Sequence, residues 1–143
     1  MKFWDSSAIV PLICREKASA SMRRLYALDM DLLVWGFTRT EVLSALYKHA
    51  RDGSLSRKGF AEAKAKLERL QADWTENVDY EGVRERAERL LGIHVLSAAD
   101  ALQLAAALVS VEEKTRGFRF VTLDERLAEA ASKEGFSVIG KYP

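Results

Sequence analysis

Four acidic residues stand at positions from which carboxylates could act together. Each lies just beyond a predicted strand or in the first turn of a predicted helix: Asp5, Glu41, Asp100 and Asp124. Carboxylates that converge in a partly dry pocket repel one another by several kcal/mol. A hard divalent cation relieves this repulsion, and oxygen-only ligands favour Mg²⁺ or Mn²⁺ over zinc. The pattern is therefore consistent with a metal site built from these four acids.

Each acid also has an ordinary structural explanation. Thr38 and Ser97 precede Glu41 and Asp100 by three residues, which is the spacing of a helix capping box. Asp124 could cap the helix that follows it, and an aspartate after a first strand could simply end that strand in a turn. Capping alone would use serine, threonine or asparagine at these junctions just as readily. From the residues alone, capping and metal binding both stay open.

The elements that must position the acids alternate between strands and helices. Strands are expected at 2–4, 31–35, 118–122 and 136–139, with a weak one at 73–78. Helices are expected at 8–14, 19–28, from 38 to the glycine at 53, at 56–70, 80–91, 97–109 and 124–134. Several strands are apolar without alternation, which indicates an α/β fold with a parallel sheet covered by helices on both faces. Sites in such folds collect beyond the carboxyl ends of the strands.

The helix predicted at 97–109 belongs in the core because it is apolar almost all round. Leu102 and Val109 recur at helical spacing on one side, and Leu104 and Leu108 make the other side apolar. Asp100 therefore lies at the N-terminal end of a buried helix, where the helix dipole favours a negative charge. If this helix begins at the carboxyl edge of the sheet, Asp100 joins the other three acids.

The composition is typical of one globular domain over residues 1–143. The chain is 48% hydrophobic and 30% charged, and its net charge of +1 gives no general case for binding nucleic acid or membranes. The single cysteine, Cys14, excludes an intrachain disulfide and suits a reducing cytosol. We expect no signal peptide and no run of the ~20 apolar residues that a membrane span needs. A cytoplasmic protein without membrane contact is expected.

Taken in order, four segments resemble the motifs of PIN-domain ribonucleases, specifically the VapC-type toxins of toxin–antitoxin pairs. They are Trp-Asp-Ser-Ser-Ala at 4–8, Thr-Glu-Val at 40–42, Ala-Asp-Ala-Leu-Gln-Leu-Ala at 99–105 and Phe-Val-Thr-Leu-Asp at 120–124. The resemblance covers essentially the whole chain. It implies a Rossmann-like sheet of about five parallel strands and an acidic pocket that binds Mg²⁺ or Mn²⁺. It also implies endonucleolytic cleavage of RNA and inhibition by a small antitoxin protein.

The resemblance implies a division of labour among the four acids. Asp5 and Asp100 are expected to bind the metal directly, and Asp124 to bind it directly or through water. Glu41 is expected to orient the attacking water or to complete the metal's ligands. The chemistry would be metal-assisted hydrolysis of a phosphodiester bond. The residue types do not distinguish one ion from two.

Neighbouring residues have supporting roles under this interpretation. The hydroxyls of Ser6 and Thr122 could hold carboxylates or waters, with helix or turn capping as the alternative, and capping is favoured for Ser7. Arg39 is the nearest cation that could contact RNA. Apolar residues on the early helices would suit an antitoxin segment or a second copy in a homodimer: Tyr26, Leu28, Tyr47 and Phe60. The tryptophans at 35 and 74 are expected in the core rather than against bases.

Two features depart from the family pattern. Many relatives have histidine where this chain has Gln103, and we expect that position to be structural. The third strand is also too polar to define from the sequence. The alternative function is a PIN-like module that binds RNA or protein without cutting. A phosphatase of the haloacid-dehalogenase type is disfavoured, because it needs a second aspartate where this chain has Ser7.

Overall fold

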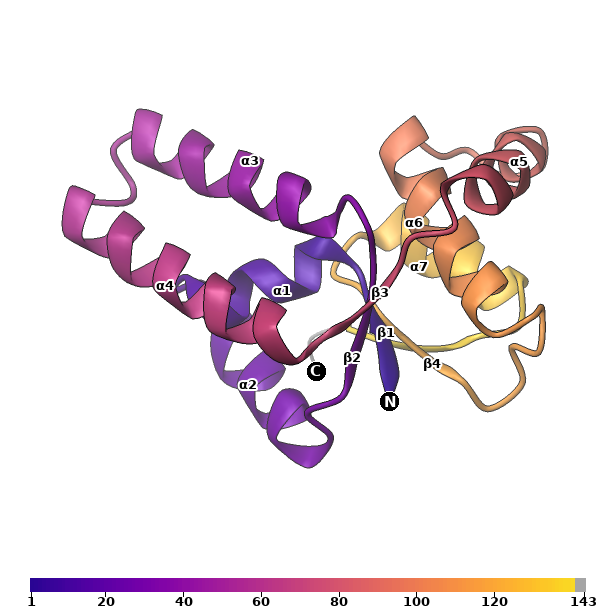
Figure 1. Cartoon of the computed structure of the whole chain (residues 1–143), viewed down its shortest axis with the longest axis horizontal. Coiled ribbons are helices and arrows are strands. Elements are labelled where there is room, and N and C mark those ends of the chain that lie inside the picture. Colours follow the sequence, from indigo (N-terminus) through magenta and orange to yellow (C-terminus); the bar gives the residue numbers. More distant parts are fainter. Residues whose placement is uncertain (141–143) are drawn as a thin grey trace.

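The computed structural model describes residues 1–140, in which one parallel sheet lies between two groups of helices (Figure 1). The strands are β1 (Lys2–Trp4), β2 (Leu32–Trp35), β3 (Thr75–Asn77), β4 (Arg119–Val121) and β5 (Ser137–Ile139). The helices are α1 (Ser6–Ile13), α2 (Ser19–Leu28), α3 (Thr38–Arg51), α4 (Arg57–Asp73), α5 (Tyr80–Leu91), α6 (Ala98–Ser110) and α7 (Glu125–Lys133). The predicted α/β class is confirmed. The last three residues of the predicted 1–143 domain lie outside the described part.

The strand order β3-β2-β1-β4-β5 explains how the helices are divided between the two faces. The chain moves outward from β1 to β3, and then returns to add β4 on the other side of β1. Because crossovers between parallel strands are right-handed, this reversal places the later helices on the opposite face. Helices α1–α4 cover one face and α5–α7 cover the other (Figure 1). The predicted cover of helices on both faces is confirmed.

The strands are apolar without alternation because each face of the sheet has its own core. Phe3 and Leu33 point into the core under α5–α7, whereas Trp4 and Val34 point into the core under α1–α4. Successive side chains of a strand point to opposite faces, so a strand between two cores needs apolar residues at every position. Helix α6 is likewise buried over most of its length, as its sequence predicts.

Several predicted boundaries differ from the structure. Helix α1 begins at Ser6 rather than at residue 8, because Asp5 is its N-cap and accepts a hydrogen bond from the backbone N–H of Ser7. The prediction that the serine hydroxyls cap this helix is wrong. Helix α4 continues to Asp73, past the predicted end at 70. The weak strand predicted at 73–78 is real but short, and β3 pairs with β2 at the edge of the sheet.

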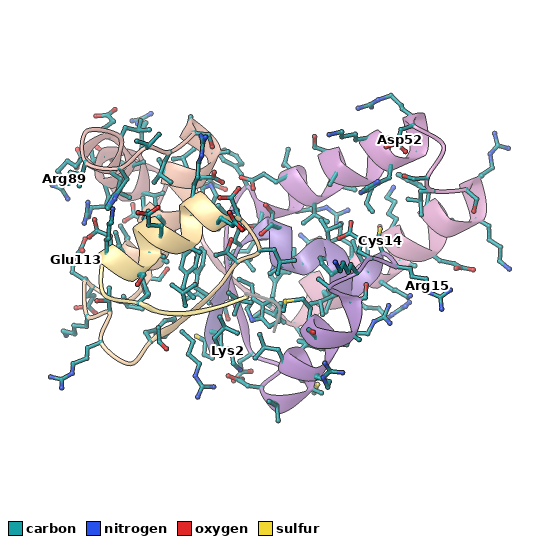
Figure 2. All side chains as sticks on the ribbon, turned by 180° about the vertical axis from the view of Figure 1, so that it is seen from behind. Lys2, Cys14, Arg15, Asp52, Arg89 and Glu113 are labelled. Carbon is teal, nitrogen blue, oxygen red and sulfur yellow. The ribbon has the colours of Figure 1, made fainter. Side chains whose placement is uncertain are left out.

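Other sequence expectations concern the interior and the membrane. Trp35 and Trp74 are both buried, as predicted. Cys14 is buried in the half of the molecule formed by α1–α4, and Lys2 lies at the start of β1 (Figure 2). The Lys2 ammonium group is also buried and pairs with Asp29 at 2.9 Å. Within residues 1–140, no helix combines the length and apolar character needed to cross a membrane.

Candidate active site

The centre of the sheet contains the point where the strand order reverses. Strands β1 and β4 are neighbours there, with Trp4 in register with Val121. Asp5 directly follows β1, and its backbone N–H donates to the carbonyl of Val121 at 2.9 Å. Asp124 follows β4 by three residues and begins α7. Two of the four acids therefore flank the switch point of the sheet, which is the usual place for a site in open α/β folds.

Asp5 is the most buried of the four acids, with 2% of its surface exposed. Its Oδ2 accepts hydrogen bonds from the hydroxyls of Ser7 and Thr122, the latter at 2.9 Å. Burial raises the pKa of Asp5 above its usual value, the two hydroxyl donors lower it, and the nearby charge of Glu41 raises it. The carboxylate is therefore held rigidly in a place where its negative charge is unfavourable.

Glu41 lies in the first turn of α3 and is half-buried. Its Oε2 accepts hydrogen bonds from the hydroxyl of Ser6 at 2.6 Å and from Nε2 of Gln103 at 3.0 Å. The Ser6 hydroxyl also lies 3.3 Å from Oδ1 of Asp5, so it stands between the two acids and donates its one hydrogen to the nearer, Glu41. Burial raises the pKa of Glu41, and the negative charge of Asp100 raises it further.

Asp100 and Asp124 complete the group from the starts of α6 and α7. Burial raises the pKa of Asp100, and the charges of Asp124 and Asp5 raise it further. The backbone N–H of Asp100 donates to the hydroxyl of Ser97 at 3.2 Å, and Oδ1 of Asp124 accepts from the N–H of Leu127 at 2.8 Å. Asp100 therefore interacts electrostatically with Asp5, Glu41 and Asp124, and Asp5 also interacts with Glu41. The structure places the four carboxylates predicted from the sequence at the same end of the strands.

Capping and site geometry coexist at these junctions. Asp5 and Asp124 cap α1 and α7, and Ser97 caps α6. Thr38 is not a cap, because the N-cap of α3 is the residue before it. Ser7 was expected to be a capping residue, but its hydroxyl bonds the Asp5 carboxylate and accepts from a backbone N–H in the β4–α7 connection. Asp5 and Asp124 therefore cap their helices and still lie at the edge of the sheet where the site is.

Two further residues near the site have partners that the sequence does not predict. Gln103, expected to be structural, is fully buried, and its amide also donates to Glu41. The available signal was one polar side chain on an otherwise apolar helix. Arg39 instead points toward α4, where it bonds Gln71 and lies 3.9 Å from a carboxylate oxygen of Glu68. The structure does not bring Arg39 into contact with the acids.

The donor set suits a hard cation in its chemistry. The groups around the site are carboxylate and hydroxyl oxygens, which Mg²⁺ and Mn²⁺ prefer. The hydrogen bonds and ion pairs described for residues 1–140 bring no lysine or arginine onto the four acids. In the same residues, no three histidine, cysteine, aspartate or glutamate side chains are arranged closely enough to hold a metal ion as they stand. Metal binding would therefore have to draw the acids together.

Comparisons with known proteins agree with this architecture. The family model described as PIN domain matches residues 2–133. The crystal structure of PAE2754 from Pyrobaculum aerophilum superposes with a TM-score of 0.63 and 22% sequence identity, over 97% of this chain and 87% of that one. At this identity the likeness concerns the fold alone. None of the curated proteins compared with the chain matches it.

Proposed function

The chain belongs to the PIN domain family, and from this membership we propose that it is a metal-dependent endoribonuclease that acts as the toxin of a toxin–antitoxin pair. PIN domains are generally nuclease modules, and PIN nucleases usually use divalent metal ions. The finer proposal adds RNA as the substrate, Mg²⁺ or Mn²⁺ as the metal, and a small antitoxin as the inhibitor. A cytoplasmic location is part of the same proposal.

One observation carries the catalytic part of this proposal. Asp5, Glu41 and Asp100 each have a raised pKa, and neighbouring acids contribute to the shift in every case. A fold that served only structure would gain stability by replacing one of these acids with a neutral residue. Carboxylates that are kept together at a stability cost are typical of functional sites.

The proposed roles follow from how firmly each acid is held. Asp5, Asp100 and Asp124 would hold the metal, with Asp5 as the fixed ligand because Ser7 and Thr122 immobilise it. A bound divalent ion lowers the pKa of its water and offsets negative charge on the phosphate. Glu41 would orient the attacking water. Thr122 supports the site by donating to Asp5 and accepting from the backbone N–H of Asp124 at 3.1 Å.

The proposed substrate and partners would meet the chain at its exposed groups. Arg39 would contact RNA only after leaving its partners on α4. Leu28 is 81% exposed and Tyr47 is 49% exposed, and both lie on the α1–α4 side. Such apolar surface would suit an antitoxin segment or a second copy in a homodimer. Light scattering of the purified chain tests the homodimer, and a monodisperse monomer would contradict it.

The decisive test is cleavage of RNA by the purified chain with Mg²⁺, with Mn²⁺ and with EDTA. We expect cleavage only with metal and strong loss of cleavage in Asp100→Asn. The matched control is Asp31→Asn, which removes an exposed acid away from the site and should cleave like the wild type. Equal cleavage by Asp100→Asn would refute the mechanism. Metal-independent RNA binding without cleavage would instead indicate the module that binds without cutting. Single-stranded DNA is assayed in parallel, to test whether RNA is the preferred substrate.

A further inference from the structure

Gln103 is a fully buried amide beside one of the site acids. It lies on α6 with 0% of its surface exposed, among alanine and leucine residues that form the core. A buried amide costs free energy unless its polar atoms are hydrogen-bonded. The burial of this side chain must therefore be explained by its hydrogen bonds rather than by apolar packing.

The Nε2 group of Gln103 uses both of its hydrogens on residues of α3. It lies 3.2 Å from Oγ1 of Thr38, which is also fully buried, and 3.0 Å from Oε2 of Glu41. The Oε1 atom is buried without a hydrogen-bond partner among the described residues. The opposite amide orientation would press Oε1 against the Glu41 carboxylate and leave two N–H groups unpaired, so the described orientation is the better one.

The hydrogen bonds described for the Glu41 carboxylate all go to one of its two oxygens. Its Oε2 receives two neutral donors, the Ser6 hydroxyl from α1 and the Gln103 amide from α6. No donor to Oε1 of Glu41 is described in residues 1–140. Two donors from different helices fix the plane of the carboxylate and leave its second oxygen available for water.

We propose that Gln103 is a positioning residue, whose amide fixes the orientation of the Glu41 carboxylate that the hydrolytic reaction requires. It acts through Glu41 and does not touch the substrate. This inference rests on the proposed nuclease function. Partners that orient the groups of a metal site typically change activity by about 10- to 100-fold when removed.

The substitution that isolates this role is Gln103→Met, which keeps the length of the side chain and removes its N–H groups. We expect kcat to fall by about 10- to 100-fold with little change in KM, because the lost interaction orients a reacting group rather than binding RNA. The control on the same helix is Ser110→Ala. It removes a hydroxyl that bonds Asn77 and the Ala106 carbonyl at the far end of α6. It should lower stability without changing kcat.

A double-mutant cycle with Glu41→Gln separates positioning from packing. If Gln103 acts through Glu41, adding Gln103→Met to Glu41→Gln should cause no further loss of kcat. Independent, multiplying effects of the two substitutions would overturn the proposal. Should Gln103→Met fail to fold, the same cycle is run with Gln103→Leu. That substitution also removes the N–H groups, introduces no buried charge and should reduce kcat by a similar factor.

A second readout does not depend on cleavage. The Gln103 hydrogen bond lowers the pKa of Glu41, so carboxyl carbon NMR should find this pKa higher in Gln103→Met than in wild type and unchanged in Ser110→Ala. An unchanged Glu41 pKa in Gln103→Met would overturn the positioning role. If the wild type cleaves no RNA while the pKa moves as expected, the nuclease proposal fails but the hydrogen-bond assignment stands.

Discussion

The hydroxyl of Thr122 should stabilise the fold in a way that depends on the charge of Asp5. Thr122 is buried and donates to Oδ2 of Asp5 at 2.9 Å, while its oxygen accepts from the N–H of Asp124 at 3.1 Å. In Thr122→Val the shape is kept, but the buried carboxylate loses a donor and the N–H loses its acceptor. A hydrogen bond to a charged group contributes about 2 kcal/mol and an unpaired, partly buried N–H costs about 1 kcal/mol.

The expected loss at neutral pH is therefore about 3 kcal/mol, which lowers the Tm of a chain of this size by about 10 °C. The Thr122 hydrogen bond lowers the pKa of Asp5, so its stabilising effect is present while Asp5 is ionised and weakens as Asp5 takes up a proton. Urea unfolding of both proteins from neutral to mildly acidic pH measures this difference. We expect the gap between wild type and Thr122→Val to narrow by about half as the pH falls.

The matched control is Thr115→Val. Thr115 donates to a neutral acceptor, the carbonyl of Glu134, at 2.9 Å and lies away from the acids. Its loss should cost about 1 kcal/mol at every pH in the series. A penalty for Thr122→Val that is no larger than this, or that stays constant with pH, would refute the argument that Thr122 stabilises the ionised Asp5 carboxylate.

The metal-free wild type should become more stable as the pH falls from neutral toward the ordinary values of 3.8 to 4.5. Three site acids have a raised pKa, so the folded chain takes up protons at a higher pH than the unfolded chain does. Urea unfolding midpoints in EDTA that fall steadily as the pH is lowered would contradict this prediction. Mn²⁺ at about a hundred times its Kd should stabilise the wild type by about 2.7 kcal/mol, and Asp100→Asn should lose most of this shift in a thermal melt. Asp29→Asn should cost about 2 kcal/mol, because it removes the negative charge that pairs with the buried Lys2 ammonium. Urea unfolding measures this loss, with Asp31→Asn as the control that removes an exposed acid. An equal loss of stability in Asp31→Asn would argue against the ion pair between Asp29 and Lys2.

The sequence predicts the fold well because its strands and helices follow strong patterns. A strand such as Leu32–Trp35 is apolar at every position, and this occurs only where both faces of a sheet are covered. The acids were found from their place after strands and at helix starts, which parallel topology converts into nearness in space. What the sequence could not give is the strand order, since β3 has too few apolar residues to define its partner.

Hydrogen-bond partners were harder to predict than positions. Ser7 and Ser97 are both serines at the start of a helix, yet one bonds a site acid and the other caps its helix. Ser7 also lies beside Thr122, because β4 pairs with β1, and this contact spans more than a hundred residues. The partners of Gln103 could not be predicted either, because they lie on α3 and not on its own helix.

The central place of β1 and β4 also bears on how the chain is made. Strand β1 is made before its neighbour β4, which begins only at Arg119, and Asp124 follows β4. A nascent chain that ends before Asp124 cannot hold all four carboxylates together. The four acids can therefore come together only after β4 has been made and has paired with β1.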